Sequence, residues 1–241
     1  MNIVALIPAR LEASRFPKKL IQDLNGKPVI YRTVENVLKM DVFDEIAIVA
    51  DDAIFIDILK PLDIKVFHTT ENFECGSDRI ASVAQFYQDA DILINVQGDE
   101  PFIKKDFIVT LIDSFKDTAV SVASLMHKLD EKEVDNQNFV KVVVNEKNDA
   151  LLFSRSVIPF HRNKNYTFDY YRHIGVYAFK PSALQAFSQW NYGALEMAEQ
   201  IEALRFIENG IKIRMSLINE LTLGIDTPQD LELARKYFSN L

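Results

Sequence analysis

Residues 92–101 read Ile-Leu-Ile-Asn-Val-Gln-Gly-Asp-Glu-Pro, and this stretch decides the fold class. Its first five residues are mostly apolar, as is typical of a strand that helices cover on both faces. Gly98 permits a tight turn directly after the strand, and Asp99 follows it. The pattern predicts a buried parallel strand over 92–96 with a carboxylate at its carboxyl end.

Short apolar strands and amphipathic helices alternate outward from this stretch. We expect strands at 3–7, 45–50, 64–68, 92–96 and 119–125, and helices at 27–40, 52–59, 78–88 and 102–115. Such alternation predicts an α/β fold, in which a doubly wound, mostly parallel sheet lies between two helical layers.

The regular alternation of strands and helices ends at about residue 128. We expect strands at 139–145, 151–154, 171–179 and 211–218, and helices at 182–187, 194–209 and 228–238. We interpret residues 1–241 as a single domain with a β-rich arm or insertion over approximately 128–180. The position of this arm makes it a candidate for dimerisation.

Composition excludes several classes of protein. Hydrophobic residues make up 48% of the chain, which is enough for a sizeable core. The net charge of -8 argues against general nucleic-acid binding, which needs a basic face. The single cysteine, Cys75, cannot form an internal disulfide and fits a reducing compartment. The first apolar run ends at Pro8, too early for a signal peptide or a membrane span, so we predict a cytoplasmic protein.

A cationic loop follows the first expected strand. Residues 8–20 read Pro-Ala-Arg-Leu-Glu-Ala-Ser-Arg-Phe-Pro-Lys-Lys-Leu. Ligands of open α/β sheets bind beyond the carboxyl ends of the strands, where Arg10, Arg15 and Lys19 can contact a polyphosphate. Neither Gly-x-x-x-x-Gly-Lys nor Gly-x-Gly-x-x-Gly is present, which argues against P-loop NTPases and simple dinucleotide dehydrogenases. From the loop alone, a solvated basic loop is the alternative.

Two carboxylates are candidate metal ligands. Asp99 ends the strand at 92–96, and Asp226 lies in Gly-Ile-Asp-Thr-Pro, between an expected strand and a helix. Mg²⁺ binds to one or two carboxylates together with phosphate oxygens. Asp99 could instead be a turn residue, and Asp226 could be a helix cap. Asp89-Ala-Asp91 matches the Asp-x-Asp of metal-dependent glycosyltransferases, but it precedes its strand and so lies at the wrong edge of the sheet.

Six motifs carry a resemblance to one family. They are Ile-Pro-Ala-Arg at 7–10, Arg15/Pro17/Lys19, Val-Gln-Gly-Asp-Glu-Pro at 96–101, Phe-Ser-Arg-Ser at 153–156, Tyr-Arg-His-Ile-Gly-Val-Tyr-Ala at 171–178 and Gly-Ile-Asp-Thr-Pro at 224–228. In this order, and over nearly the whole chain, the sequence resembles the 3-deoxy-manno-octulosonate (Kdo) cytidylyltransferases. The Gln-Gly-Asp-Glu-Pro and His-Ile-Gly-x-Tyr segments are the specific ones.

The resemblance implies a three-layer, Rossmann-like nucleotide-diphospho-sugar transferase fold with a mixed sheet, and a homodimer. It also implies the transfer of CMP from CTP to Kdo with Mg²⁺, for lipopolysaccharide biosynthesis. The resemblance assigns nucleotide binding to Ala9, Arg10, Ser14, Arg15, Lys19, Arg79 and Gln97. It assigns metal binding to Asp99 and Asp226. It assigns binding of the sugar acid to Gln97, Arg155, His173, Tyr177 and Glu202. Among these, Lys19, Arg10 and Asp99 are the implied catalytic residues.

Spacing supplies two further expectations. Alternation places His173, Gly175, Tyr177 and Phe179 on one face of their strand, either a binding face or part of the sheet core. Glu196, Glu199 and Glu202 recur every three residues, which predicts one helix face, by default a solvated acidic one.

The sequence departs from the family pattern near the expected site. Phe73 stands where the family usually has His, Cys75 replaces Ser, Ser77 replaces Thr and Lys18 replaces Gly. Ala203 stands where a sugar-binding Gln is usual, so the 8-amino analogue of Kdo or another acidic sugar stays open as substrate. Two functions outside this family also stay open: a glycosyltransferase that uses a nucleotide sugar, and a regulatory module that binds CTP.

Overall fold

The chain forms two compact units in a computed structural model that describes residues 1–12, 16–73, 75–163 and 165–239. Unit 1 comprises Met1–Asp106 and Thr222–Leu241, and unit 2 comprises Phe107–Leu221. Unit 1 is therefore discontinuous: the chain leaves it, builds unit 2 and returns to it. Two compact units can belong to one domain, so the single-domain interpretation stays a prediction.

The sheet of unit 1 is parallel among four strands. The central strand β1 (Ile3–Ala9) pairs with β4 (Glu45–Ala50) on one side and β6 (Ile92–Asn95) on the other. Next to β4 lies β5 (Lys65–His68). Every residue of β1 and β6 is buried, as their apolar sequences predict. The carboxyl ends of β1 and β6 consequently meet at one edge, where the cationic loop and Asp99 begin.

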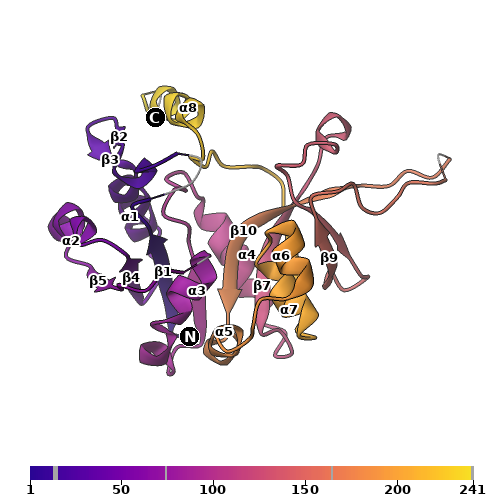
Figure 1. Ribbon diagram of the computed structural model, residues 1–241, viewed down its shortest axis with the longest axis horizontal. Coiled ribbons are helices and arrows are strands. Elements are labelled where there is room, and N and C mark those ends of the chain that lie inside the picture. The colour runs from indigo at the N-terminus through magenta and orange to yellow at the C-terminus, as the bar shows by residue number, and fades with distance from the viewer. Residues whose placement is uncertain (13–15, 74, 164, 240–241) are drawn as a thin grey trace. The chain divides into compact units, whose positions relative to one another are not determined.

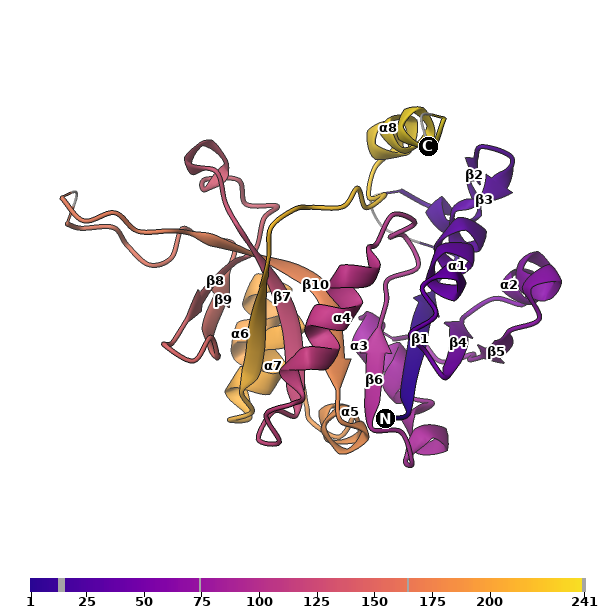
Figure 2. The same ribbon diagram turned by 180° about the vertical axis from the view of Figure 1, so that it is seen from behind.

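Helices cover both faces of this sheet. Figures 1 and 2, seen from opposite sides, show α3 (Gly76–Ala81) in front of the strands in one view and α1 (Val29–Lys39) in front in the other. The described residues of unit 1 also form α2 (Ile54–Leu59), α8 (Pro228–Phe238) and the 3-10 helices η1 (Lys19–Ile21), η2 (Lys60–Leu62) and η3 (Ala84–Tyr87). The helix expected at 78–88 is thus wrong as one element, because the structure has α3 and η3 there.

A small hairpin that we did not predict precedes α1. Strands β2 (Asp23–Leu24) and β3 (Lys27–Pro28) pair across Asn25 and Gly26, whose φ angles are 52° and 83°. Asn-Gly is the residue pair that tight two-residue hairpins favour, because both positions need a positive φ. The Asn-Gly dipeptide is therefore the sequence feature from which this hairpin could have been predicted.

Unit 2 has a mixed sheet. Strand β7 (Val122–Lys128) pairs in parallel with β11 (Ile213–Ile218) and antiparallel with β10 (Tyr171–Phe179). A further antiparallel pair, β8 (Lys141–Val144) and β9 (Ala150–Ser154), joins β10 through β8. The predicted α/β class, with a mixed and mostly parallel sheet, is confirmed.

The helices of unit 2 also lie on two faces. They are α4 (Lys105–Ser114), the 3-10 helix η4 (Glu131–Glu133), α5 (Pro181–Phe187), α6 (Ala194–Glu199) and α7 (Ala203–Glu208). Helices α6 and α7 lie in front of the strands in Figure 1, and α4 lies in front of them in Figure 2.

The helix expected at 194–209 is wrong as one element. Gln200 has a φ of 54°, in the left-handed region, and this residue ends α6 before α7 begins. The predicted shared face of the three glutamates therefore does not exist. Glu196 is instead buried against Arg205, and Glu199 accepts hydrogen bonds from residues 154 and 155.

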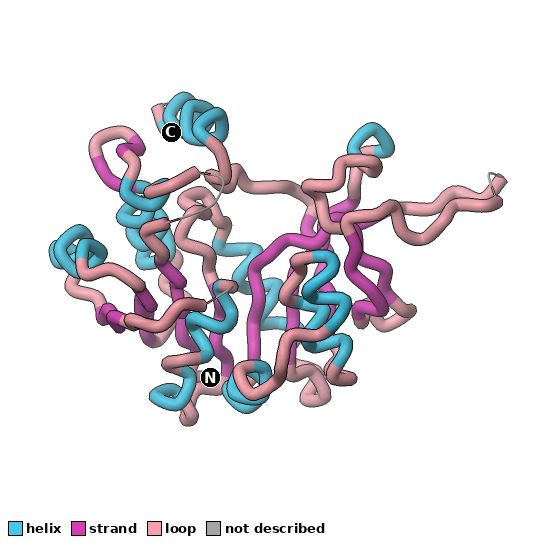
Figure 3. Tube along the Cα trace, in the orientation of Figure 1, coloured by secondary structure: helices cyan, strands magenta, loops and turns pink. Residues whose placement is uncertain are grey.

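The segment between β9 and β10 extends from the rest of unit 2 without helix or strand among its described residues (Figure 3). Its side chains include Phe160, which is 86% exposed, and Tyr166, which is 63% exposed. Strands β8, β9 and β10 make the region over 128–180 rich in β structure, as predicted, while its role in dimerisation stays a prediction. Among the described residues, no helix is long and apolar enough to cross a membrane.

Candidate active site

Three charged side chains of unit 1 converge at the edge where β1 and β6 end. The Lys19 Nζ donates hydrogen bonds to the Asp99 carboxylate and to Asp226 Oδ1, the latter at 3.0 Å. Asp99 follows β6, and Asp226 lies on the returning segment just before α8. The Ile225 N–H donates to the Asp99 carbonyl at 2.9 Å, which fixes the two carboxylate-bearing segments side by side.

Lys19 is nearly buried, with 9% of its surface exposed. Burial alone would lower the pKa of its ammonium group, but the charges and hydrogen bonds of Asp99 and Asp226 outweigh burial and raise that pKa above its usual value. Lys19 therefore stays protonated at neutral pH. Its charge keeps two carboxylates together that would otherwise repel each other.

The two carboxylates suit a hard cation whose other ligands come from a substrate. No group of three or more His, Cys, Asp or Glu side chains that could hold a metal occurs among the described residues. A pair of carboxylates is nevertheless what Mg²⁺ takes from a protein when phosphate oxygens and water complete its octahedron. Asp99 and Asp226 already point to one place, because both contact the same ammonium group.

A pocket lies beside this cluster. It encloses about 130 Å³ and is lined by Pro8, Arg10, Lys19, Leu20, Phe73, Cys75, Gly76, Arg79, Gln97, Gly98 and Asp99. The structure thus brings together five residues that the sequence predicted for nucleotide and metal, namely Arg10, Lys19, Arg79, Gln97 and Asp99. A sixth, Ala9, is buried at the end of β1. This volume holds only part of a nucleotide, so the rest would extend toward the exposed Arg10.

Ser14 and Arg15, which were also predicted to bind the nucleotide, lie outside the described residues. Their assignment stays a prediction from the family resemblance.

Two of the departures from the family pattern have a structural role here. The Cys75 Sγ accepts a hydrogen bond from the Asp78 N–H at 3.4 Å and so caps α3, as a serine would. The Phe73 ring lies 5.3 Å from the Arg79 guanidinium carbon, a cation–π distance. Arg79 is 5% exposed and is further held by Asp51 at 3.3 Å. The departures therefore keep the pocket wall intact.

Gly98 is required by close packing. A Cβ at this position would lie 2.9 Å from the Pro8 carbonyl oxygen, a distance that real Cβ atoms essentially never show. The turn that carries Asp99 can approach the end of β1 only because residue 98 has no side chain.

Asn95 is a residue that the sequence reasoning missed. It is completely buried, and its Oδ1 accepts a hydrogen bond from Gln97 Nε2 at 3.3 Å. Its own Nδ2 has no hydrogen-bond partner within the described part of the chain. Asn95 could have been predicted from the sequence, because it is a polar residue in the otherwise apolar run at 92–96.

In unit 2, the structure brings His173 and Tyr177 together. Their ring centroids are 5.3 Å apart, and the His173 ring also packs edge-on against Phe153 at 4.9 Å. The two side chains therefore share one face of β10, as the alternation predicted. Enclosure of the imidazole, with a smaller effect of Arg172, lowers the pKa of His173 to about 3. The ring is consequently neutral at physiological pH.

Ser124, a second residue that we missed, fixes the tautomer of His173. Its hydroxyl lies 2.9 Å from His173 Nε2 and donates to the carbonyls of Ile174 and Val176 at 3.1 and 3.0 Å, in the bulge of β10. The hydroxyl has a single proton, and when either carbonyl accepts it, Nε2 is the donor to Ser124. Nδ1 of the neutral ring is then an acceptor.

Arg155 and Glu202, the remaining predicted sugar contacts, lie at the two ends of other elements of unit 2, after β9 and before α7. Arg155 donates to the backbone carbonyls of Gln137, Glu199 and Gln200 at 3.2, 2.8 and 3.4 Å. Its guanidinium thereby holds the bend between α6 and α7, and Glu202 directly precedes α7. The nucleotide and metal candidates thus lie in unit 1, and Arg155, His173, Tyr177 and Glu202 lie in unit 2.

Fold and site together define a class of protein. A parallel α/β sheet that ends in a cationic pocket and a pair of carboxylates is an arrangement suited to nucleotidyl transfer. A family model described as "Cytidylyltransferase" matches residues 4–213. The class is therefore that of the cytidylyltransferases, enzymes of the nucleotidyltransferase kind.

Individual relatives narrow this class. Proteins named 3-deoxy-manno-octulosonate cytidylyltransferase are 44% identical in Christiangramia forsetii (99% of this chain, 97% of the relative) and 43% identical in Flavobacterium johnsoniae (98% of each). The solved structure of a CMP:2-keto-3-deoxy-manno-octonic acid synthetase complexed with CTP superimposes with a TM-score of 0.93, at 37% identity over 100% of this chain and 99% of that one. This chain belongs to the 3-deoxy-manno-octulosonate cytidylyltransferase family.

Proposed function

We propose that this enzyme transfers CMP from CTP to the anomeric hydroxyl of 3-deoxy-manno-octulosonate and releases pyrophosphate. The observation that carries the proposal is the convergence of Lys19, Asp99 and Asp226 beside a pocket lined by Arg10 and Arg79. The names of the relatives and the CTP in a related structure support the choice of both substrates.

The reaction is a direct displacement. The anomeric oxygen forms a bond to the α-phosphorus of CTP while the bond from that phosphorus to the bridging oxygen of the β-phosphate breaks. The sugar hydroxyl loses its proton to solvent, and pyrophosphate leaves with the bonding electrons. Arg10 and Lys19, whose pKa is raised by Asp99 and Asp226, offset the negative charge that builds up on the phosphates. We also assign Ser14 and Arg15 to the triphosphate, from the family resemblance.

We propose Mg²⁺ as the cofactor, held by Asp99 and Asp226. When bound, it would polarise the phosphate and lower the pKa of the sugar hydroxyl. Lys19 supports this site from the protein side, because its ammonium group holds both carboxylates in position before substrates arrive.

For the sugar we propose Gln97, His173, Tyr177 and Glu202, with Arg155 as a contact to the carboxylate. His173 offers Nδ1 as an acceptor for a sugar hydroxyl, since its ring is neutral and Nε2 is bonded to Ser124. Arg155 additionally positions residues 199–202 through its bonds to backbone carbonyls.

We further propose a homodimer formed through the arm, a cytoplasmic location, a role in lipopolysaccharide biosynthesis and no nucleic-acid partner. The exposed aromatic side chains of the arm support the dimer, and the net charge of -8 argues against nucleic acid.

The test is pyrophosphate release from CTP and Mg²⁺ with Kdo, with its 8-amino analogue and without sugar. We expect rapid release with Kdo and none without sugar. Strong preference for the 8-amino sugar would overturn the assignment of Kdo and make the buried Ala203 a specificity position. CTP binding without release for either sugar would overturn the enzymatic proposal.

A further inference from the structure

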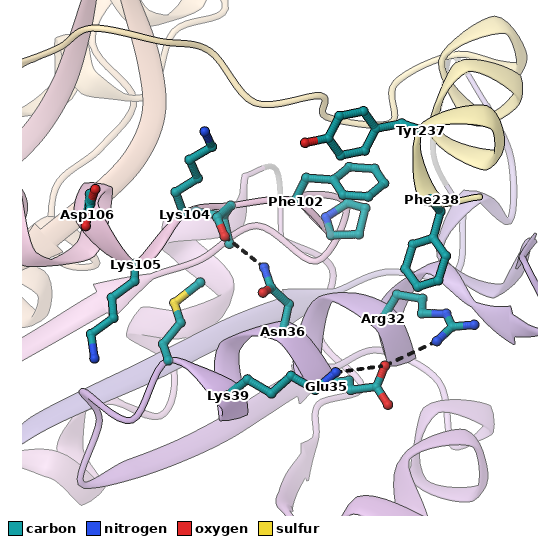
Figure 4. Close-up of a pocket in the computed structure, with 13 residues that line it drawn as sticks. Arg32, Glu35, Asn36, Lys39, Phe102, Lys104, Lys105, Asp106, Tyr237 and Phe238 are labelled. Atoms are coloured by element: carbon teal, nitrogen blue, oxygen red, sulfur yellow. Dashed lines mark hydrogen bonds and ion pairs between the residues drawn. The ribbon is translucent and has the colours of Figure 1, made fainter. Parts of the chain in front are cut away.

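A second cavity of unit 1, about 560 Å³ in volume, lies apart from the candidate active site (Figure 4). Three elements form its walls: the outer face of α1, the segment 101–106 and the end of α8. None of its lining residues lines the pocket beside Lys19 and Asp99. Its volume falls in the range of sites that bind small molecules, roughly 300–1,000 Å³.

The charge of this cavity is opposite to that of the whole chain. Arg32, Lys39, Lys104 and Lys105 line it, against two carboxylates, Glu35 and Asp106, in a chain whose net charge is -8. Glu35 is already shared by Lys27, Arg32 and Lys39, with nitrogen–oxygen distances of 2.9, 3.2 and 3.9 Å. The cationic side chains therefore leave a local positive field that attracts an anion.

Aromatic side chains occupy one end of the cavity, away from Lys104 and Lys105 (Figure 4). The rings of Phe102 and Tyr237 meet edge to face, with centroids 4.8 Å apart, and Arg32 lies 4.3 Å over the ring of Phe238. Figure 4 shows Phe102 and Tyr237 side by side at this end. Tyr237 is 48% exposed, so part of its side chain remains accessible to a ligand.

We propose that this cavity binds a small phosphorylated compound that carries a planar ring, the chemistry of a nucleotide. Its phosphate is placed by Lys39 and Lys105, and its ring stacks on Tyr237. Lys39 is 72% exposed and Lys105 is also exposed, so both side chains can turn to a ligand.

Each wall is connected to one of the two candidate metal ligands: α1 is hydrogen-bonded to the turn that carries Asp99, the segment 101–106 follows that turn in sequence, and α8 follows Asp226. The ligand is therefore an effector of the active site. From α1, the Thr33 hydroxyl donates to the Gly98 carbonyl at 2.8 Å, and Asn36 donates to the Ile103 carbonyl at 2.8 Å. Helix α8 begins at Pro228, directly after Asp226 and its cap Thr227. A ligand that ties α8 to the segment 101–106 restricts the movement of both carboxylates.

Calorimetric titration with phenyl phosphate tests the proposal. CTP and sugar are both omitted, because CTP belongs to the same chemical class as the proposed ligand and would compete for the cavity. The titration is repeated with Arg10→Ala, because Arg10 lines the active-site pocket and not this cavity. We expect phenyl phosphate to bind more tightly than inorganic phosphate. Lys39→Glu should weaken its binding by about fivefold or more, because an attraction becomes a repulsion. Tyr237→Ala should remove the difference between the two probes.

Lys116→Glu is the matched control. Lys116 is 77% exposed and pairs with Asp113 near the end of α4, much as Lys39 pairs with Glu35 near the end of α1, but it does not line the cavity. The affinity of the Lys116→Glu variant for phenyl phosphate should equal that of the unaltered protein. Thermal unfolding confirms that each variant is folded.

Three results would overturn the proposal: no binding of phenyl phosphate, equal affinity in Lys39→Glu, or loss of binding in Arg10→Ala. The last result would place the probe in the active-site pocket. Binding needs no turnover, so this test remains decisive even if the proposed function fails. Where turnover occurs, phenyl phosphate should change the rate of pyrophosphate release, and Lys39→Glu should diminish that change.

Discussion

At Lys19, one ammonium group holds two carboxylates from distant parts of the sequence. Each of the three residues was predictable, because Lys19 follows a strand in a cationic loop and both aspartates follow expected strands. Their mutual contact was not predictable, since side-chain direction at a loop depends on tertiary packing. Asn95 and Ser124 were missed for the same reason: their hydrogen bonds join them to residues on neighbouring strands or beyond the strand end.

Asp99→Asn should lower the rate of pyrophosphate release by about two to four orders of magnitude, since it removes a negative ligand from the proposed metal site. Asp91→Asn is the control, because Asp91 is 57% exposed and its carboxylate contacts Asn2 and the N-terminus, before β1 begins. Steady-state assays of pyrophosphate release measure turnover in both variants. Near-normal turnover in Asp99→Asn would contradict the assignment of Asp99 to the metal site. Loss of turnover in Asp91→Asn would instead support a metal-binding role for the Asp-x-Asp at 89–91.

His173 should make stability depend on pH. Its pKa is about 3 in the folded protein and near 6.5 in the unfolded chain, so between these values only the unfolded chain binds the proton. The free energy of unfolding therefore falls as the pH falls below 6.5, by about 1 to 2 kcal/mol at pH 5. Urea unfolding at pH 7 and pH 5 measures this. In His173→Asn, the difference in the free energy of unfolding between pH 7 and pH 5 should shrink. An unchanged difference would show that His173 does not cause the pH dependence.

At the scale of elements, hydrophobic periodicity predicted strands and helices well but could not predict breaks within helices. Strands β4 and β10 and helix α8 begin and end where expected, because their flanking residues are strong turn or capping signals. The break at Gln200 has no such signal, since glutamine rarely adopts a positive φ. The bonds that Arg155 and Arg205 make to this region arise only in the folded unit.

Glu196→Gln should destabilise the bend between α6 and α7. Glu196 is 6% exposed, and its carboxylate takes two hydrogen bonds, at 2.6 and 2.7 Å, from Arg205, which is 1% exposed. Neutralising Glu196 removes the opposite charge that faces the buried Arg205, a loss of about 3 to 5 kcal/mol. Glu232→Gln breaks an exposed Glu–Arg pair and should cost at most about 1 kcal/mol. Equal losses in chemical denaturation would contradict the prediction.

Thr227→Ala should weaken the start of α8. The Thr227 hydroxyl accepts from the Asp230 N–H at 3.2 Å, and the Asp230 carboxylate accepts from the Thr227 N–H at 2.8 Å, a complete capping box. We expect the free energy of unfolding to fall by about 1 kcal/mol. The exposed Thr70 lies in a loop, so Thr70→Ala should be neutral. A neutral Thr227→Ala would mean that α8 is held by packing alone.

At the scale of the whole molecule, composition and alternation sufficed for the α/β class, since the type of each element follows from local pattern. The order of strands within each sheet did not follow from that pattern. The central place of β1, and the β7–β11 pairing across most of unit 2, depend on contacts between residues far apart in sequence. The discontinuity of unit 1 was unpredictable for the same reason.

Phe160→Ser should convert the proposed dimer to a monomer. A phenylalanine that is 86% exposed in one chain is best explained by burial against a second copy. Phe86→Ser is the control, since Phe86 is 62% exposed but lies in unit 1, stacked on Phe67. Light scattering of the unaltered protein and both variants gives the masses. A monomeric unaltered protein, or a Phe160→Ser variant that stays dimeric, would exclude the arm as the interface.

The discontinuity of unit 1 has a consequence for protein synthesis. The ribosome makes β1, the cationic loop and Asp99 early, but Asp226 and α8 emerge only after all of unit 2. Until then, the buried Lys19 has only one of its two carboxylate partners. A nascent chain therefore cannot complete the catalytic cluster, and a translation product that stops before residue 222 would retain much of the nucleotide pocket without the means to use it.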